Sequence, residues 1–133
     1  MKTTAIEGVG EVYAERLREA GIRSDRALLK RAATRREREL LAETTGLTEA
    51  QILEWMNHAD LMRIRGVGPE YADLLEEAGV DTVPELAQRN PSNLYQTIVK
   101  VAHEKKLVRR PPTQGMIGAW VAEAGRLPRT IEY

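Results

Sequence analysis

The residues with the clearest chemical potential are two Gly-Val-Gly triplets, Gly8-Val9-Gly10 and Gly66-Val67-Gly68. Each joins an apolar residue to a segment with helical periodicity. Two glycines around one small apolar residue allow a sharp backbone turn while the valine packs inward. The N–H groups of the turn and of the first helical turn then point outward, where they bind one phosphate or carboxylate. The triplets therefore predict anion-binding hairpins.

Positive side chains follow the first hairpin closely and form a second group late in the chain. Such runs are typical of solvated helix faces, and cations also stabilise helix C-termini. Placed beside a hairpin, they can instead contact nucleic-acid phosphates. The first group contains Arg16, Arg18, Arg23, Arg26, Lys30, Arg31, Arg35, Arg36 and Arg38, and the second contains Lys100, Lys105, Lys106, Arg109 and Arg110.

The candidate nucleic-acid-binding residues combine the hairpins with cations from both groups. We select Gly8, Val9, Gly10, Arg16, Arg18, Gly66, Val67, Gly68, Lys105, Lys106, Arg109 and Arg110.

Carboxylates near both hairpins oppose phosphate binding. Glu11 directly follows the first hairpin, where it stabilises its own helix through the dipole and competes with an incoming anion. An acidic stretch follows the second hairpin, which we therefore interpret as mainly structural. Its members are Glu70, Asp73, Glu76, Glu77, Asp81 and Glu85.

Catalytic signatures are missing from the sequence. The 133 residues include no cysteine and only two histidines, His58 and His103, which argues against thiolate chemistry and histidine-rich metal sites. There is no phosphate loop of the Gly-x4-Gly-Lys-Ser/Thr type, no His-Glu-x2-His pair and no Gly-x-Ser-x-Gly elbow. We therefore expect no enzyme, no cofactor and no metal.

An internal repeat organises the chain. The segments IEGVGEVYAERLREAGI, from Ile6, and IRGVGPEYADLLEEAGV, from Ile64, match at ten of seventeen positions. Weaker matches continue to Trp55 and Trp120. Duplication of a unit of about 60 residues follows, and we divide the chain into repeats 1–61 and 62–126 with an extended tail, 127–133.

Helical signals dominate both repeats. Capping residues and stop glycines predict helices over 11–20, 24–30, 34–44 and 48–62 in the first repeat, and the second follows the same plan from Pro69 to Ala124. We predict an all-α fold of two repeats with about five short helices each. The expected core contains Leu17, Leu28, Leu40, Ile52, Trp55, Leu75, Leu86, Ile98, Ile117 and Trp120.

Two tyrosines occupy the same position of both repeats, on the first turn after each hairpin. Tyr13 and Tyr71 are suited either to stack on a partner or to pack between the two copies. We favour packing between the copies.

The hairpin pattern resembles the helix-hairpin-helix motif, a sequence-nonspecific binder of nucleic-acid backbones. The stretch from Gly8 through Gly46-Leu47-Thr48-Glu49 is similar to the small helical N-terminal domain of archaeal and eukaryotic strand-exchange recombinases. The tandem arrangement, with MNHADLMRIRGVG at the junction and KKLVRRPP late, resembles an uncharacterised bacterial family of tandem helix-hairpin-helix proteins. The resemblance implies the fold but leaves the function open, because this fold has both DNA-binding and protein-binding members. Motifs that bind backbones usually carry a cation or small polar residue where Glu11 and Pro69 stand.

Two functional hypotheses remain open. The first is a DNA- or RNA-binding module that contacts backbone phosphates weakly through the first hairpin. The second is a protein-interaction adaptor that uses the acidic surface of the second repeat. Twenty cations and twenty carboxylates give zero net charge, which argues against binding by bulk charge alone. No apolar run reaches 18 residues, so we expect a cytoplasmic protein without a membrane partner.

Overall fold

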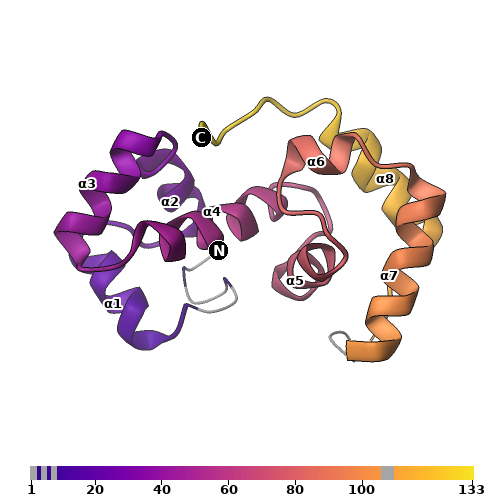
Figure 1. Ribbon diagram of the computed structural model, residues 1–133, viewed down its shortest axis with the longest axis horizontal. Helices are drawn as coiled ribbons and strands as arrows, with labels where there is room; N and C mark the ends of the chain where they lie inside the picture. The colour runs from indigo at the N-terminus through magenta and orange to yellow at the C-terminus, as the bar shows by residue number, and fades with distance from the viewer. Residues whose placement is uncertain (1–2, 4–5, 7–8, 106–109) are drawn as a thin grey trace. The chain divides into compact units, whose positions relative to one another are not determined.

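The computed structural model describes residues 3, 6, 9–105 and 110–133, and the chain forms two compact units. Unit 1 comprises Met1–Asp60 and Arg129–Tyr133, and unit 2 comprises Leu61–Pro128. The described residues form eight α-helices and no β-strand (Figure 1), which confirms the predicted all-α fold. The change of unit at Leu61 lies one residue from the expected boundary.

The first four helices build unit 1. They are α1 (Glu11–Glu19), α2 (Asp25–Arg31), α3 (Arg35–Thr45) and α4 (Glu49–Leu61), whose last residue belongs to unit 2. Thr34 and Glu37 form the predicted capping box at the start of α3, and Gly46 ends this helix in the left-handed conformation. Local sequence signals therefore place these boundaries to within one or two residues.

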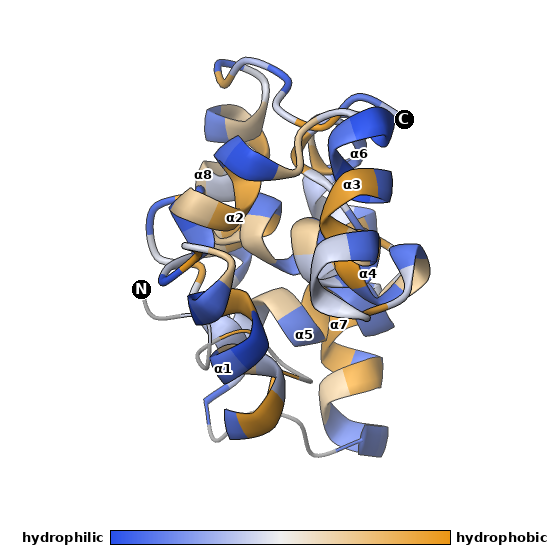
Figure 2. Ribbon diagram, turned by 90° about the vertical axis from the view of Figure 1, so that its left-hand side faces the viewer, coloured by the Kyte–Doolittle hydropathy of each residue, from blue (hydrophilic) through white to orange (hydrophobic). Residues whose placement is uncertain are grey.

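Unit 2 contains α5 (Pro69–Glu77), α6 (Val83–Ala87), α7 (Pro91–Lys105) and α8 (Gln114–Ala124). Helix α8 packs against α6 and α7, and α5 packs against α7. The described residues thus provide four helices in each half, fewer than the five expected. The helices carry alternating hydrophilic and hydrophobic bands (Figure 2), as amphipathic helices do.

The two hairpin turns have the same hydrogen bonds. In unit 2 the amide of Ile64 donates to the carbonyl of Leu61, and the amide of Val67 donates to Ile64, both at 3.1 Å. Ile6 and Val9 make the corresponding bonds in unit 1, at 3.0 and 3.1 Å. Both valines are buried, so they pack inward as predicted. Two consecutive turns thereby deliver the chain to Gly10 and Gly68, the N-caps of α1 and α5.

The helices after the hairpins also end alike. Gly21 and Gly79 have φ angles of +89° and +92°, a conformation that glycine adopts without a steric penalty. The amides of Ile22 and Val80 donate back to Leu17 and Leu75, at 2.8 and 2.9 Å. The matching sequences therefore adopt matching local structures from the turn to the helix end.

Nine of the ten predicted core residues are buried, and Leu40 is the error. Its side chain is 44% exposed, whereas that of its neighbour Leu41 is 2% exposed. The inward face of α3 is set by Arg38 and Leu41, three residues apart, and a step of one residue turns a helix by about 100°. Both leucines fit an apolar pattern, but only one lies on that face.

The predicted tail contains no helix, and its last five residues belong to unit 1. Ile131 is buried, and the amide of Glu132 donates to the carbonyl of Ala33 at 2.8 Å. The tail is therefore a packed part of unit 1, which no feature of its sequence indicated.

The two leucines of α3 provide a matched test of the fold. Leu41→Ala is expected to lower the free energy of unfolding by roughly 2–5 kcal/mol, because it leaves a cavity in the core. Leu40→Ala is expected to lower it by less than about 1 kcal/mol, because water already reaches this side chain. Chemical denaturation of both variants measures the difference. Equal losses of free energy of unfolding would contradict the inward orientation of Leu41 and the outward orientation of Leu40.

Candidate anion-binding hairpin

The helices after the hairpins begin without a side-chain cap. Within the described residues, the N-caps of α1 and α5 are glycines that make no side-chain cap hydrogen bond. A side-chain oxygen accepts a first-turn amide at the start of each of the other six helices. These capping residues are Ser24, Thr34, Thr48, Thr82, Asn90 and Thr113. The first-turn amides of α1 and α5 are therefore left for water or a ligand.

Gly10 is exposed, and the protein itself does not require a glycine there. Its φ of −80° is open to any residue, and a Cβ built at this position meets nothing within 4 Å. Glycine is an acceptable N-cap residue in its own right. Its absent side chain also allows a ligand atom to approach the amides of Glu11 and Val12 closely.

The two hairpins differ in the donors that they present. Pro69 is the first helical residue of α5 and has no N–H, whereas Glu11 at the matching position of α1 donates one. Val12, the second residue of α1, is 68% exposed, and Glu70 matches it in unit 2. The first hairpin is therefore the better anion site. Gly8 lies outside the described residues.

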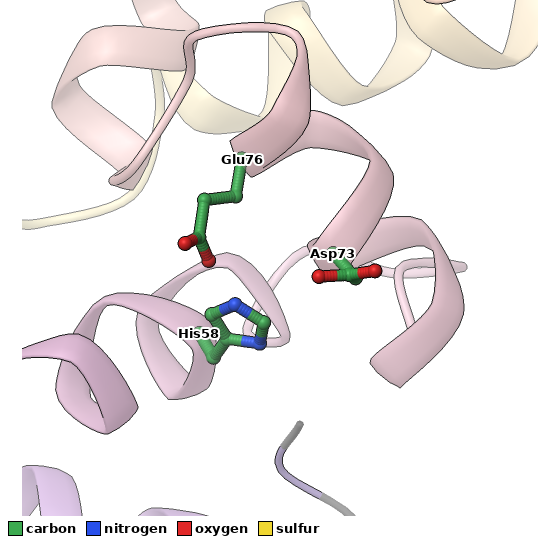
Figure 3. Close-up of side chains that lie close together, drawn as sticks. All are labelled: His58, Asp73 and Glu76. Carbon is green, nitrogen blue, oxygen red and sulfur yellow. The ribbon is translucent and has the colours of Figure 1, made fainter. Parts of the chain in front are cut away.

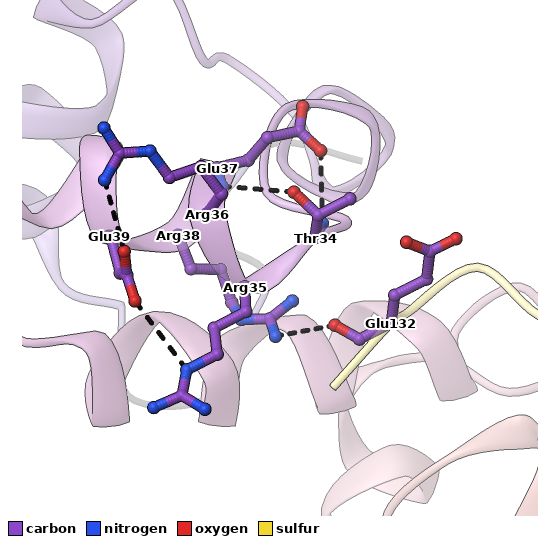
Figure 4. Close-up of polar contacts among 7 residues, drawn as sticks. All are labelled: Thr34, Arg35, Arg36, Glu37, Arg38, Glu39 and Glu132. Atoms are coloured by element: carbon purple, nitrogen blue, oxygen red, sulfur yellow. Dashed lines mark hydrogen bonds and ion pairs between the residues drawn. The ribbon is translucent and has the colours of Figure 1, made fainter.

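Most cations of the first group already have partners in unit 1. Arg18 pairs with Glu15, and Arg35 and Arg36 pair with Glu39 (Figure 4). The guanidinium of Arg31 donates to the carbonyl of Ala20 at 2.8 Å. These contacts support helices and helix ends, so the side chains concerned are poor candidates for ligand contacts.

Arg38 is a structural residue. It is buried, and Nη1 donates to the carbonyls of Ala32 at 3.0 Å and Ala33 at 2.9 Å, while Nη2 donates to the carbonyl of Glu132 at 2.7 Å (Figure 4). A buried guanidinium requires such acceptors. The charge pattern alone grouped Arg38 with the surface cations.

Four exposed cations of the first group have neither an ion pair nor a side-chain hydrogen bond within the described part of the chain: Arg16, Arg23, Arg26 and Lys30. Arg26 and Lys30 stand four residues apart on α2 and thus share one face. Arg16 lies in the last turn of α1, about 9 Å along the helix axis from Gly10 at 1.5 Å per residue. Arg16 therefore stands at the opposite end of α1 from the hairpin amides.

The late basic group is only partly described. Lys105 is the exposed last residue of α7, and Arg110 is exposed, its carbonyl accepting a hydrogen bond from Tyr71 at 2.9 Å. Lys106 and Arg109 lie outside the described residues.

The tyrosines after the hairpins pack on tryptophans of their own units, and packing between the two copies stays a prediction. The rings of Tyr13 and Trp55 have centroids 5.4 Å apart in unit 1, and those of Tyr71 and Trp120 are 5.2 Å apart in unit 2. Each tyrosine covers the tryptophan of its own repeat, an arrangement that stabilises aromatic pairs. Each tyrosine lies in the first turn of α1 or α5, from which its ring reaches the tryptophan of the same unit.

The region after the second hairpin has the opposite charge at matching positions. Residues 16–31 contain six cations and two carboxylates, whereas residues 74–89 contain one cation and four carboxylates. Leu74 is buried where Arg16 is exposed, and Asp73 and Glu76 project from α5, one turn apart (Figure 3). Carboxylates that follow Gly66, Val67 and Gly68 in the sequence disfavour a phosphate by like charge, and the structural role of this hairpin stays a prediction.

The fold and the hairpins define an all-α protein with two glycine turns, each leading into an uncapped helix. The model of the family described as "Domain of unknown function (DUF4332)" matches residues 7–127, and the chain belongs to this family. No curated protein and no solved structure matches the chain. The resemblance to recombinase domains stays a prediction. No described helix has the length and apolar character needed to cross a membrane.

The free energy of unfolding tests which cations are structural and which are exposed without a partner. Arg38→Ala is expected to lower the free energy of unfolding of unit 1 by roughly 2–5 kcal/mol, because three carbonyls in and beside the buried interior lose a charged donor. Arg26→Ala is expected to change it by no more than about 0.5 kcal/mol, because the side chain is exposed. Native-state hydrogen exchange reports both values. A loss for Arg26→Ala as large as that for Arg38→Ala would contradict this distinction.

Proposed function

We propose that the chain is a non-enzymatic module with two helix-hairpin-helix repeats that binds nucleic-acid backbones without sequence preference. Unit 1 makes the contacts. The amides at the start of α1 hold one phosphate, and Arg16, Arg23, Arg26 and Lys30 contact neighbouring phosphates.

The single observation that carries this proposal is the pattern of helix caps. Each described helix begins with a side-chain oxygen on a first-turn amide, except the two that follow the hairpins. First-turn amides left uncapped at the positive end of a helix bind anions. The exposed, sterically open Gly10 gives the phosphate access to them.

The charge distribution supports unit 1 over unit 2 as the binding unit. The proposed surface carries cations without ion pairs, whereas the second hairpin has one amide fewer and an acidic surrounding. Sequence-independent binding at physiological salt has dissociation constants of roughly 10⁻⁴ to 10⁻⁶ M. One competent hairpin with few cations belongs at the weak end of this range. Phosphate contacts of this kind serve DNA and RNA alike.

The alternative function is a protein-interaction adaptor. It is favoured by the exposed side chains of Glu70, Glu77 and Glu85 on α5 and α6, which suit a basic partner. The two functions use different units, so the location of binding separates them.

Nuclear magnetic resonance with a short DNA duplex locates the contact. We expect the amide signals of Val9, Gly10 and Glu11 to shift, and those of Val67, Gly68 and Glu70 to shift much less. Two or three phosphate contacts give a slope between roughly −2 and −3 when log K is plotted against log salt concentration. Larger amide shifts in unit 2 would support the adaptor instead. So would the absence of any response to nucleic acid at low salt, if unit 2 also captures a basic protein.

Substitution of Gly10 tests the role of the open glycine. Gly10→Ala is expected to leave stability nearly unchanged, because the backbone conformation and the surrounding space accept a methyl group. It should weaken duplex binding at least severalfold, because the methyl group obstructs the phosphate. Gly68→Ala, which also meets open space, is the matched control and should leave affinity unchanged. If both variants bind the duplex with the affinity of the unaltered chain, a phosphate does not approach Gly10 closely.

Charge reversal at the two ends of α1 separates local from global electrostatics. Glu11→Lys is expected to strengthen duplex binding, because it replaces a carboxylate beside the amides with a cation. Glu19→Lys makes the same change in net charge at the last residue of α1 and should strengthen binding less. Fluorescence anisotropy at several salt concentrations measures both affinities. Equal gains would indicate attraction by net charge rather than a site at the hairpin.

A further inference from the structure

Segment 129–133 is bound to unit 1 as a peptide ligand is bound to a receptor. The buried guanidinium of Arg38 donates to the carbonyl of Glu132 at 2.7 Å, and the carbonyl of Ala33 accepts the amide of Glu132 at 2.8 Å (Figure 4). Ile131 is only 2% exposed, and the hydroxyl of Tyr133 lies 3.2 Å from the side-chain oxygen of Asn57. Ala33, Arg38 and Asn57 thus form a docking site in unit 1.

The segment is joined covalently to the other unit. Pro128 is the last residue of unit 2, and its carbonyl accepts a hydrogen bond from Arg63 at 2.7 Å. Only Arg129 and Thr130 separate this anchor from buried Ile131, and no helix forms between residues 125 and 130. A short connection without regular structure therefore joins Pro128 to the contacts that Ile131, Glu132 and Tyr133 make in unit 1.

We propose that the docking site also accepts segment 129–133 of a second copy, so that two chains exchange their segments and form a dimer. This inference is independent of nucleic-acid binding. A vacant site has a buried guanidinium without its Glu132 acceptor and an uncovered apolar surface, and the identical segment satisfies both. Exchange breaks and makes the same contacts, so the concentration of chains sets the balance between monomer and dimer.

Two complementary variants test the exchange. Ile131→Asp keeps the docking site but disables the segment, because a carboxylate replaces the buried side chain. Arg38→Met disables the site but keeps the segment. Linked modules meet at effective concentrations in the millimolar range, so the two variants are mixed at about 1 mM and their mass is measured by light scattering.

We expect each variant alone to be monomeric and the equimolar mixture to contain a species of twice the monomer mass. Adding Glu132→Ala to the Arg38→Met chain should preserve this species, because only the backbone of Glu132 makes the docking contacts. A mixture that stays at the monomer mass overturns the proposal.

If circular dichroism shows that Arg38→Met does not fold, a labelled peptide of residues 127–133 is titrated into the full-length Ile131→Asp chain. Saturable binding that is lost when the peptide itself carries Ile131→Asp supports docking from a second molecule. No binding up to about 1 mM peptide, the effective concentration of a linked segment, overturns it.

Discussion

Backbone groups at helix ends are the constraint on which this structure depends. An α-helix leaves four N–H groups and four carbonyls without partners, whatever its length. Helices of five to fifteen residues make up the described fold, so a large share of the backbone lies at such ends. The protein satisfies them with Ser, Thr and Asn caps, with left-handed glycines and with buried Arg38. The two units differ in which helix ends have such partners and in which side chains surround the ends that have none.

Arg38 satisfies the end of α2 and segment 129–133 at once. The carbonyls of Ala32 and Ala33 follow α2, and the guanidinium holds both while it binds segment 129–133 through Glu132. A buried guanidinium is costly unless acceptors surround it, and the segment provides one of them. The far end of the sequence thus completes the polar interior of unit 1, although all of unit 2 intervenes along the chain.

The uncapped starts of α1 and α5 are exceptions to the same constraint, and exceptions of this kind occur at functional sites. The turn geometry is common to both units, yet the side chains around it differ in charge. Gly10 has open space and an amide donor at Glu11, while Gly68 is followed by Pro69 and carboxylates. The proposed phosphate site therefore lies in the first repeat, and we expect the second hairpin to serve the fold.

The sequence by itself determined the helical class and most of the core, and it predicted the repeated hairpin and a boundary near residue 61. These features depend on local propensity, capping residues and periodicity, which act within a few residues. Tertiary structure alone decided that Leu41 rather than Leu40 faces inward, and that Tyr13 and Tyr71 pack on tryptophans of their own units. It alone separated structural Arg38 from exposed Arg26 and placed Ile131 in unit 1. The sequence does not show whether a charged side chain meets water or a distant carbonyl, or whether an apolar side chain is exposed or buried. Burial is fixed by contacts between residues far apart in the chain.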